Sequence, residues 1–300
     1  MKFVRFKNEN NENLGIFNND ESKIIEISSV LNGRKFSSMI DLIENITEEE
    51  IELLQKTFGG KISEFVQYDV SRVKICSPIK RPIHDIICVG VNYKDHLEET
   101  KESFKDDFTE PAKTVYFSKR ASEIIGAEDA VKSRMDLDTH LDYEVELAVI
   151  MGKRGTDIAR EDVEKYIFGY SIFNDISARV MQQSHLQWYR GKSLDTYSSM
   201  GPSILHKIAL PFPIEVDVKS YVNNELRQSS NTKLFLADIP QIISEISAGI
   251  TLEPGDIIIT GTPSGVGMGM KPQGFMKKGD IVTCEIPAPY SDSSPLEPVL

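Results

Sequence analysis

Two glutamates one residue apart are the first side chains in this sequence that could do chemistry. Residues 141–147 read Leu-Asp-Tyr-Glu-Val-Glu-Leu, an alternation of apolar and acidic residues with the period of a β-strand. Glu144 and Glu146 are therefore expected on one face of that strand. Two carboxylates side by side at the start of an apolar run repel each other and resist burial, unless one holds a proton or a cation lies between them. A hard metal ion is the simpler solution.

A third carboxylate is expected nearby. Residues 168–175 predict a second strand, and Asp175 stands at its C-terminal end. Three oxygen ligands without a neighbouring cysteine or histidine suit Mg²⁺, Mn²⁺ or Ca²⁺ better than zinc. The alternative is that the two glutamates form the solvated face of an edge strand, which is the usual place of alternating acidic residues. Candidate residues elsewhere in the chain favour the metal site.

His96 and Glu99 form a possible general base. Residues 91–99 predict a turn followed by a short helix, in which positions three apart share one face. A carboxylate that holds an imidazole fixes its tautomer and raises its basicity for proton abstraction. An ordinary surface pair with the same spacing is the alternative. Residues 98–110 are charged and aperiodic, which is typical either of a solvated loop or of a lid that carries the pair over a site.

The elements that would position these groups divide the chain into two units. In residues 1–75, short strands, an asparagine-rich turn and a helix with a capping box at Thr47 predict a small α+β unit without catalytic groups. The prolines of residues 77–82 favour an extended linker. Residues 76–300 hold the candidate groups. Further strands are expected there over residues 86–90, 114–118 and 256–260, together with a helix capped by Asp238.

The composition limits the partners and the compartment. The chain has 34 basic and 46 acidic residues, a formal charge of −12, and no basic cluster, which argues against nucleic acid and anionic membranes as partners. A bound metal and a few inward lysines or arginines could still hold an anionic substrate. The first residues lack the apolar core of a signal peptide, and no run could span a bilayer, so a cytoplasmic protein is expected. The three scattered cysteines suggest reduced core residues.

Two glycine-containing segments do not match common catalytic motifs. Residues 191–193, Gly-Lys-Ser, do not form a nucleotide-binding loop because Leu186 occupies the position of its first glycine. In residues 261–267, Pro263 replaces the serine that a nucleophile elbow requires. The glycines around it instead allow a ligand to approach the backbone closely.

The order of these motifs resembles that of the fumarylacetoacetate hydrolase family. The resemblance covers about residues 80–287 and rests on six segments. They are Asn92-Tyr93-x-x-His96, Phe117-x-Lys119, residues 141–147, Asn174-Asp175-x-Ser177-Ala178-Arg179, Gly191-Lys192-Ser193-x-Asp195-Thr196 and Gly261-Thr262-Pro263-Ser264-Gly265. It implies an α+β, mostly β fold, in which a mixed β-roll catalytic domain over residues 76–300 follows a small α+β domain over residues 1–75. Members of the family are commonly dimers, so a homodimer is expected.

The resemblance also implies roles for individual residues at the matching positions. The metal ligands would be Glu144, Glu146 and Asp175, with Mg²⁺ as the expected ion and Mn²⁺ or Ca²⁺ as alternatives. The catalytic residues would be His96 and Glu99, which activate water or move a proton, and Lys192, which neutralises a developing anion. The substrate's carboxylate and oxygens would be held by Arg179, Gln182, Thr262 and Lys119. Arg120 stands where many members have proline, which leaves the substrate preference open.

The implied activity is that of a divalent-metal-dependent enzyme that acts on a 2-oxo acid through a metal-bound enolate. Hydrolysis of a C–C bond in a 2,4-dioxo acid, of the acylpyruvate or fumarylpyruvate type, is the preferred interpretation. Decarboxylation of oxaloacetate and isomerisation of the 2-hydroxyhepta-2,4-diene-1,7-dioate type pass through the same intermediate and stay open. A non-catalytic 2-oxo acid binding protein is a further alternative, but such a protein would have no need of the base formed by His96 and Glu99.

Overall fold

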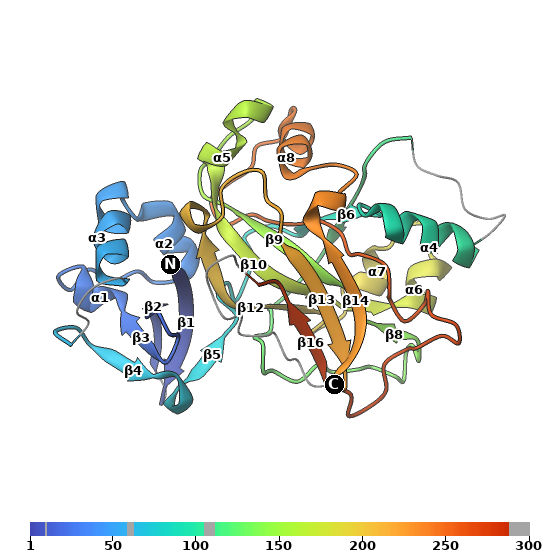
Figure 1. Ribbon diagram of the computed structural model, residues 1–300, viewed down its shortest axis with the longest axis horizontal. Coiled ribbons are helices and arrows are strands. Elements are labelled where there is room, and N and C mark those ends of the chain that lie inside the picture. Colours follow the sequence, from blue (N-terminus) through green and yellow to red (C-terminus); the bar gives the residue numbers. More distant parts are fainter. Residues whose placement is uncertain (10, 59–62, 105–111, 288–300) are drawn as a thin grey trace.

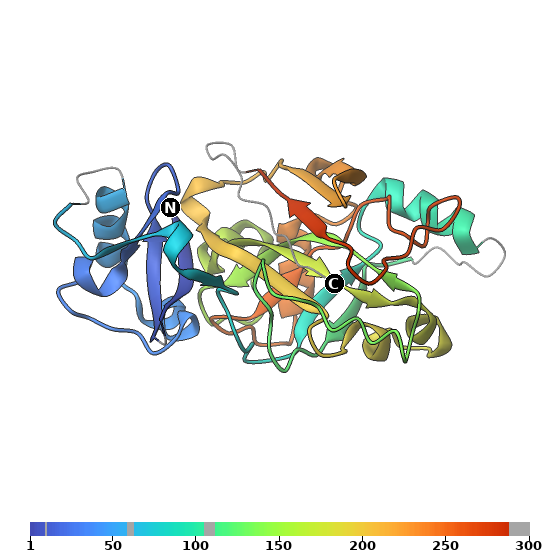
Figure 2. The same cartoon turned by 90° about the horizontal axis from the view of Figure 1, so that it is seen from below.

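The fold combines a large mixed sheet with short helices. The computed structural model describes residues 1–9, 11–58, 63–104 and 112–287, and strands make up 33% of the chain against 24% for helices. This ratio confirms the predicted α+β, mostly β class. The N-terminal unit lies at one end of the long axis, and helices α4 (Lys94–Phe104), α6 (Arg179–Ser184) and α7 (Tyr189–Lys192) lie toward the other end (Figures 1 and 2).

Eleven of the described strands form one sheet that contains strands of both units. Its neighbouring strands are antiparallel, except for the parallel pair β15 and β6. The order is β4 (Gln67–Asp69), β3 (Lys23–Glu26), β2 (Asn11–Phe17), β1 (Lys2–Asn8), β12 (Ser198–His206), β10 (Ile167–Asp175), β9 (Val145–Met151), β15 (Ile257–Ile259), β6 (Ile86–Gly90) and β7 (Val115–Lys119), with β5 (Lys74–Cys76) beside β1. Smaller sheets pair β8 (Leu141–Asp142) with β11 (Ser177–Ala178), and β13 (Asp217–Val222) with β14 (Glu225–Asn231) and β16 (Val282–Glu285).

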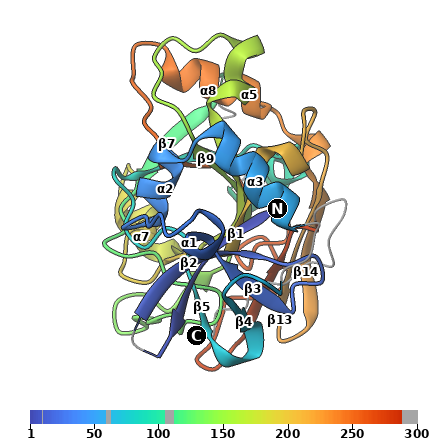
Figure 3. The ribbon, with the colours of Figure 1, turned by 90° about the vertical axis from the view of Figure 1, so that its left-hand side faces the viewer.

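One strand pair joins the N-terminal unit to the rest of the chain. Residues 2–3 of β1 pair with residues 204–205 of β12, and one hydrophobic cluster contains Leu54 from the first unit together with Ile150 from β9. Figure 3 shows this end of the molecule, with β1, β2 and β3 toward the viewer. Residues 77–82 form neither helix nor strand, as expected of a linker. Because hydrogen bonds and apolar contacts join the residues before the linker to those after it, the division into domains over residues 1–75 and 76–300 stays a proposal.

Helix ends are found where the sequence predicts them. The backbone N–H of Thr47 donates to Glu50 Oε2 at 3.0 Å, and the N–H of Glu50 donates to Thr47 Oγ1 at 3.3 Å, which completes the capping box of α3 (Glu48–Phe58). Asp238 accepts from the N–H of Gln241 at 2.9 Å and caps α8 (Ile239–Ser247). The remaining α-helices are α1 (Ile27–Val30), α2 (Met39–Asn45) and α5 (Val163–Tyr166).

The cysteines and the helices agree with the compositional expectations. Cys76, Cys88 and Cys284 are buried and free, as predicted. Burial, with the carboxylates Asp175 and Glu146 nearby, raises the pKa of Cys88 well above its usual range, so this thiol stays protonated. None of the helices in the described part of the chain is both long and apolar enough to cross a membrane.

A buried histidine at the junction of the two units makes stability depend on pH. His206 lies against the rings of Phe3 and Phe168, at centroid distances of 6.1 and 5.3 Å, and burial lowers its pKa to about 4. The imidazole takes up its proton near pH 6.5 in the unfolded chain but only near pH 4 in the folded protein. The contribution of the neutral imidazole to the free energy of unfolding is therefore complete above pH 6.5, and up to about 3 kcal/mol is lost as the pH falls to 4. We expect His206→Phe to keep the packing and flatten this slope. Urea unfolding at pH 7.0 and 4.5 measures it, and equal slopes in both proteins would contradict the assignment.

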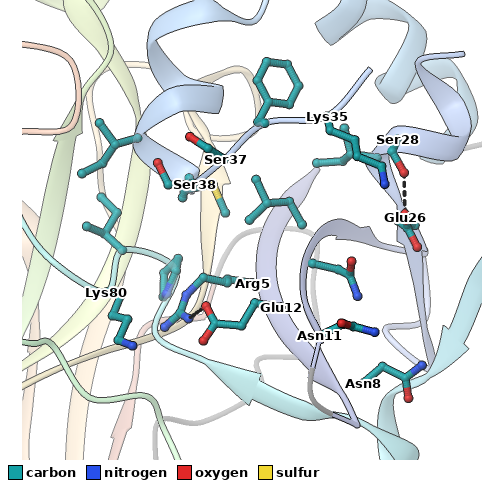
Figure 4. Close-up of a pocket in the computed structure, with 18 of the residues that line it drawn as sticks. Arg5, Asn8, Asn11, Glu12, Glu26, Ser28, Lys35, Ser37, Ser38 and Lys80 are labelled. Atoms are coloured by element: carbon teal, nitrogen blue, oxygen red, sulfur yellow. Dashed lines mark hydrogen bonds and ion pairs between the residues drawn. The ribbon is translucent and has the colours of Figure 1, made fainter. Parts of the chain in front are cut away.

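A cavity of about 880 Å³ opens in the N-terminal unit, between its strands, the start of α2 and linker residues 78–81 (Figure 4). Basic side chains line it, but they are largely paired with acids. Arg5 Nη1 lies 2.7 Å from Glu12 Oε2, and Arg34 Nη1 lies 2.6 Å from Glu50 Oε2. The charges of both arginines are therefore neutralised by acids of the same unit.

Candidate active site

The segment that carries the two glutamates is interrupted and buried. The expected continuous strand is split, because β8 ends at Asp142 and pairs with β11, whereas β9 begins at Val145 and pairs with β10. All seven residues of β9 are buried, so the alternative of a solvated edge strand is wrong. Its alternate residues belong to two different hydrophobic clusters, since Ala148 packs into one and Val149 into the other. β9 is a central strand covered on both faces.

The antiparallel pairing of β9 and β10 brings the three predicted metal ligands together. Glu146 lies opposite Phe173, and two residues later the N–H of Asp175 donates to the carbonyl of Glu144 at 2.8 Å. Asn174 also holds the backbone of Glu144, because its Oδ1 accepts from the N–H of Glu144 at 3.1 Å. One oxygen from each of the three carboxylates lies within 4.8 Å of the others, and all three residues are buried. The structure thus places the predicted triad in one cluster.

The three carboxylates have different electrostatic surroundings. Burial raises the pKa of Glu144, but the cations Lys192 and Arg179 outweigh this effect and hold that pKa at about 2. Burial and the neighbouring Asp175 and Glu144 carboxylates raise the pKa of Glu146 well above its usual range. Within the described chain Glu146 makes no ion pair, and its Oε2 accepts one hydrogen bond, from the N–H of Gly261 at 2.5 Å. Glu146 is therefore the carboxylate that most lacks a positive partner.

Three buried cations surround the triad. Lys192 Nζ bridges two of the acids, at 2.7 Å from both Glu144 Oε2 and Asp175 Oδ2. Arg179 Nη1 lies 2.6 Å from Glu144 Oε1. Lys119 donates to Asp175 Oδ1 and to the carbonyl of residue 176, and it is completely buried. Lys119 is therefore placed to position Asp175. The sequence predicts that it contacts the substrate, but it is not among the residues that line the cavity described below.

The donor set fits a hard divalent cation. With Asp142 included, four carboxylates face only three cations, and the excess negative charge falls on Glu146. Without a bound cation, Glu146 would instead hold a proton, and its raised pKa favours this protonated form. Oxygen atoms alone are offered, without cysteine or histidine in the cluster. Such ligands suit Mg²⁺, Mn²⁺ or Ca²⁺, in agreement with the sequence analysis.

His96 and Glu99 form the predicted pair on α4. His96 Nδ1 lies 2.9 Å from Glu99 Oε2, and His96 is nine-tenths buried. Because an ionised carboxylate can only accept, the Nδ1 atom carries the hydrogen and Nε2 keeps a free lone pair. The predicted loop over residues 98–110 is corrected in part, since residues 98–104 belong to α4 and residues 105–110 lie outside the described chain. A lid role stays a prediction.

The glycine-rich segment 261–270 holds this pair in place. The N–H of Gly265 donates to the second oxygen of Glu99 at 2.9 Å, and Ser264 Oγ donates to Asp95 Oδ2 at 2.9 Å. Gly265 has a φ of +100°, and an added Cβ would lie 2.0 Å from the carbonyl oxygen of Arg227. The glycines therefore permit close approach of the protein's own acids and backbone, whereas the predicted close approach of a ligand stays a prediction.

A cavity of about 270 Å³ lies between His96 of the pair and the Glu144 and Glu146 carboxylates of the triad. Its lining includes His96, Glu144, Glu146, Arg179, Gln182, Trp188, Lys192 and Thr262. Arg179 Nη2 is buried without a hydrogen-bond partner, which is costly for a charged group unless a ligand supplies an acceptor. Gln182 Oε1 accepts from Arg179 Nη1 at 3.0 Å. The Thr262 hydroxyl is already bonded to the carbonyl of Val145 at 2.9 Å, so its hydrogen is not available to a substrate.

Asp142 is a residue of the site that sequence reasoning missed. Its Oδ2 accepts from Arg179 Nε and from the N–H of Met268, both at 2.9 Å, and its Oδ1 accepts from the N–H of Gly267 at 2.6 Å. The carboxylate thus ties Arg179 to the glycine-rich segment. The signal was present in residues 141–147, where three acids alternate, although only the last two were assigned a role.

The buried network predicts a large loss of stability when Arg179 is removed. Arg179→Met leaves Asp142 and Glu144 without their guanidinium partner, and breaking such a buried pair costs about 3 to 5 kcal/mol. Urea unfolding would measure this loss. Arg134→Met is the matched control, because Arg134 forms an exposed pair with Asp136 and its removal should leave stability nearly unchanged. Equal effects of the two substitutions would contradict the network.

Comparison with known proteins agrees with this geometry. Residues 85–293 match the family model described as fumarylacetoacetate (FAA) hydrolase C-terminal. The chain belongs to the fumarylacetoacetate hydrolase family. Among relatives, it is 44% identical to oxaloacetate tautomerase YisK of Bacillus subtilis over 219 residues, which are 73% of this chain and 71% of that protein.

Solved structures of family members cover the whole chain. Fumarylacetoacetate hydrolase from the psychrophile Exiguobacterium antarcticum has a TM-score of 0.80 at 34% identity, with 100% of this chain and 99% of that chain covered. Maleylpyruvate hydrolase from Sphingobium sp. SYK-6, in complex with manganese(II) and pyruvate, has a TM-score of 0.76 at 28% identity, with 100% and 98% covered. These matches confirm the family predicted from the motifs and the family fold for both units together.

Proposed function

We propose that this protein is a divalent-metal-dependent enzyme that interconverts the keto and enol forms of oxaloacetate or a closely similar 2-oxo acid. The observation that carries the proposal is that three features meet at one cavity: Glu144 and Glu146 of the carboxylate triad, the imidazole of His96 that Glu99 holds, and the unpartnered Arg179 Nη2. The 44% identity to an oxaloacetate tautomerase supports it. It replaces C–C hydrolysis as our preferred activity.

Each group in the cavity has a task in this reaction. The unpartnered guanidinium nitrogen of Arg179 offers a charge-assisted hydrogen bond to the substrate carboxylate. His96 Nε2, with its lone pair free, removes the proton from the carbon next to the 2-oxo group, while Glu99 stabilises the imidazolium that forms. The enolate oxygen then takes up a proton from the imidazolium or from water, which gives the enol, and the same steps in reverse give the keto form. Lys192, whose pKa is raised by the Asp175 and Glu144 carboxylates despite burial, stays charged and stabilises negative charge that develops on the substrate oxygen.

The metal site would complete this arrangement. Glu144, Glu146 and Asp175 would hold the ion, and when bound it supplies a Lewis acid that polarises the 2-oxo group. Mg²⁺ is our proposal for its identity, with Mn²⁺ or Ca²⁺ as alternatives.

C–C hydrolysis is the second candidate function. The structural likeness to a maleylpyruvate hydrolase bound to manganese and pyruvate favours it. In that reaction His96 would remove a proton from water, not from carbon, and the remaining groups would keep their tasks. Decarboxylation of oxaloacetate requires no base at all, so the presence of the pair His96 and Glu99 argues for one of the proton-transfer reactions. A homodimer is also proposed, by analogy with the family.

One experiment separates these activities. Ultraviolet absorbance follows the decay of enol-oxaloacetate with Mg²⁺, with Mn²⁺ and with EDTA, each beside the metal without protein. Pyruvate release is measured in parallel from oxaloacetate, acetylpyruvate and fumarylpyruvate. The proposal expects protein-dependent enol decay that EDTA abolishes, without pyruvate release. Pyruvate from a dioxo acid alone would establish hydrolysis instead, and pyruvate from oxaloacetate alone would establish decarboxylation.

A further inference from the structure

The single tryptophan of the chain forms one wall of the catalytic cavity. The Trp188 ring meets Phe117 edge to face, with centroids 5.1 Å apart and planes at 72°. On another side, its Cζ3 atom would lie 2.6 Å from a Cβ at position 90, so only glycine there leaves room for the ring. Trp188 is half-buried, which places an indole between the cavity and solvent.

This wall stands next to the charged groups of the site. Trp188 precedes α7, and its carbonyl accepts from the N–H of Lys192 at 3.2 Å. The Lys192 ammonium lies 5.6 Å from the centroid of Phe117, the ring that Trp188 contacts. An acid bound between Lys192 and Arg179 therefore has the Phe117 and Trp188 rings as immediate neighbours. A substituent that extends from this acid toward α7 would meet the indole.

We propose that Trp188 is a specificity-determining residue that restricts the cavity to short 2-oxo acids. The proposal rests on the proposed function, because it names the substrate class of the same site. Packed aromatic rings do not yield space without losing their contacts. On this proposal a four-carbon acid such as oxaloacetate occupies the cavity without contact to the ring, whereas the longer chain of a 2,4-dioxo acid displaces the indole from its contacts with Phe117 and Gly90. Selection by size of this kind is worth about 10-fold to 200-fold.

Competition measurements test the proposal. Fumarylpyruvate and oxalate serve as long and short competitors of enol-oxaloacetate turnover with Mg²⁺ in the wild type, Trp188→Ala, Trp188→Phe and Leu186→Ala. We expect Trp188→Ala to improve the inhibition constant of fumarylpyruvate at least about 10-fold relative to that of oxalate, with Trp188→Phe in between. Leu186→Ala is the control, because Leu186 lies two residues away and is fully exposed; it should change neither constant. The same ratio in wild type and both Trp188 variants would overturn the proposal.

The fluorescence of Trp188 gives a second readout that needs no turnover. Because the chain has one tryptophan, its emission reports on this wall alone. Titration of the wild type with oxalate or fumarylpyruvate in Mg²⁺ should change the emission, and EDTA should reverse the change. Absence of both turnover and any emission change would overturn the proposed function and this proposal with it. Turnover with unaltered competition ratios would overturn the Trp188 proposal alone.

Discussion

Replacing Glu146 with glutamine should abolish metal-dependent turnover while the protein stays folded. Glutamine keeps an oxygen that can accept from the N–H of Gly261 but removes the charge that lacks a cationic partner. Loss of a residue that only supports a metal ligand costs about 10-fold to 100-fold, so loss of a ligand itself should cost at least about 100-fold. Enol-oxaloacetate decay with and without Mg²⁺ measures the effect.

Stability measurements show whether the substitution acts through the metal. A ligand that binds only the folded protein at 100 times its dissociation constant adds about 2.7 kcal/mol to the unfolding free energy. Mg²⁺ or Mn²⁺ should raise the melting temperature of the wild type but not that of Glu146→Gln. In EDTA the variant should be at least as stable as the wild type, because it buries one carboxylate fewer. Glu128→Gln, at an exposed position, is the control. Full metal-dependent activity in Glu146→Gln would rule out the metal assignment.

Replacing His96 with alanine should remove proton transfer but leave metal binding intact. General acid–base catalysis contributes about 10²-fold to 10⁴-fold, and a loss in that range is expected for enol-oxaloacetate decay. The metal-induced rise in melting temperature should be retained, because the imidazole is not part of the carboxylate triad. Glu99→Gln should show a smaller loss, since a glutamine oxygen can still accept from the imidazole N–H.

The pattern of losses also identifies the reaction. Glu98→Ala is the control on the same helix, because Glu98 pairs with Lys101 on the exposed face of α4. If His96→Ala lowered the rate of pyruvate release from a dioxo acid by the same factor as the rate of enol-oxaloacetate decay, His96 would act as the base in both reactions. Undiminished enol decay in His96→Ala would refute the role of His96, whatever the metal result.

The sequence predicted the groups of the site whose position depends on local spacing. Glu146 follows from strand alternation, and His96 and Glu99 follow from the helical repeat. Glu144 lies in the break between β8 and β9, where Asn174 and Asp175 hold its backbone. Asp175 required more, because only the antiparallel pairing of β9 with β10 brings it beside Glu144. Its assignment rested on the predicted strand over residues 168–175 and on the family resemblance, and the distances agree with it.

Other features could not be read from spacing because they depend on contacts between distant segments. Residues 98–104 lack an apolar stripe, yet they continue α4, which is anchored by polar contacts from Asp95 and Glu99 to the glycine-rich segment. A search for hydrophobic periodicity has no signal for such a helix. In the same way, Lys119 reaches Asp175 because the sheet places the end of β7, two strands beyond β15, beside the triad. No local sequence pattern predicts this strand order.

The pairing of β1 with β12 bears on how this protein can be taken apart. A recombinant chain that started at residue 76 would leave residues 204–205 of β12 without their partner strand. Unpaired backbone groups on a strand edge can pair with other molecules, which promotes aggregation. β12 is also the direct neighbour of β10, the strand that ends in Asp175. The small N-terminal unit is therefore poorly suited to removal as a dispensable module, and engineering of the catalytic site should begin from a chain that contains both units.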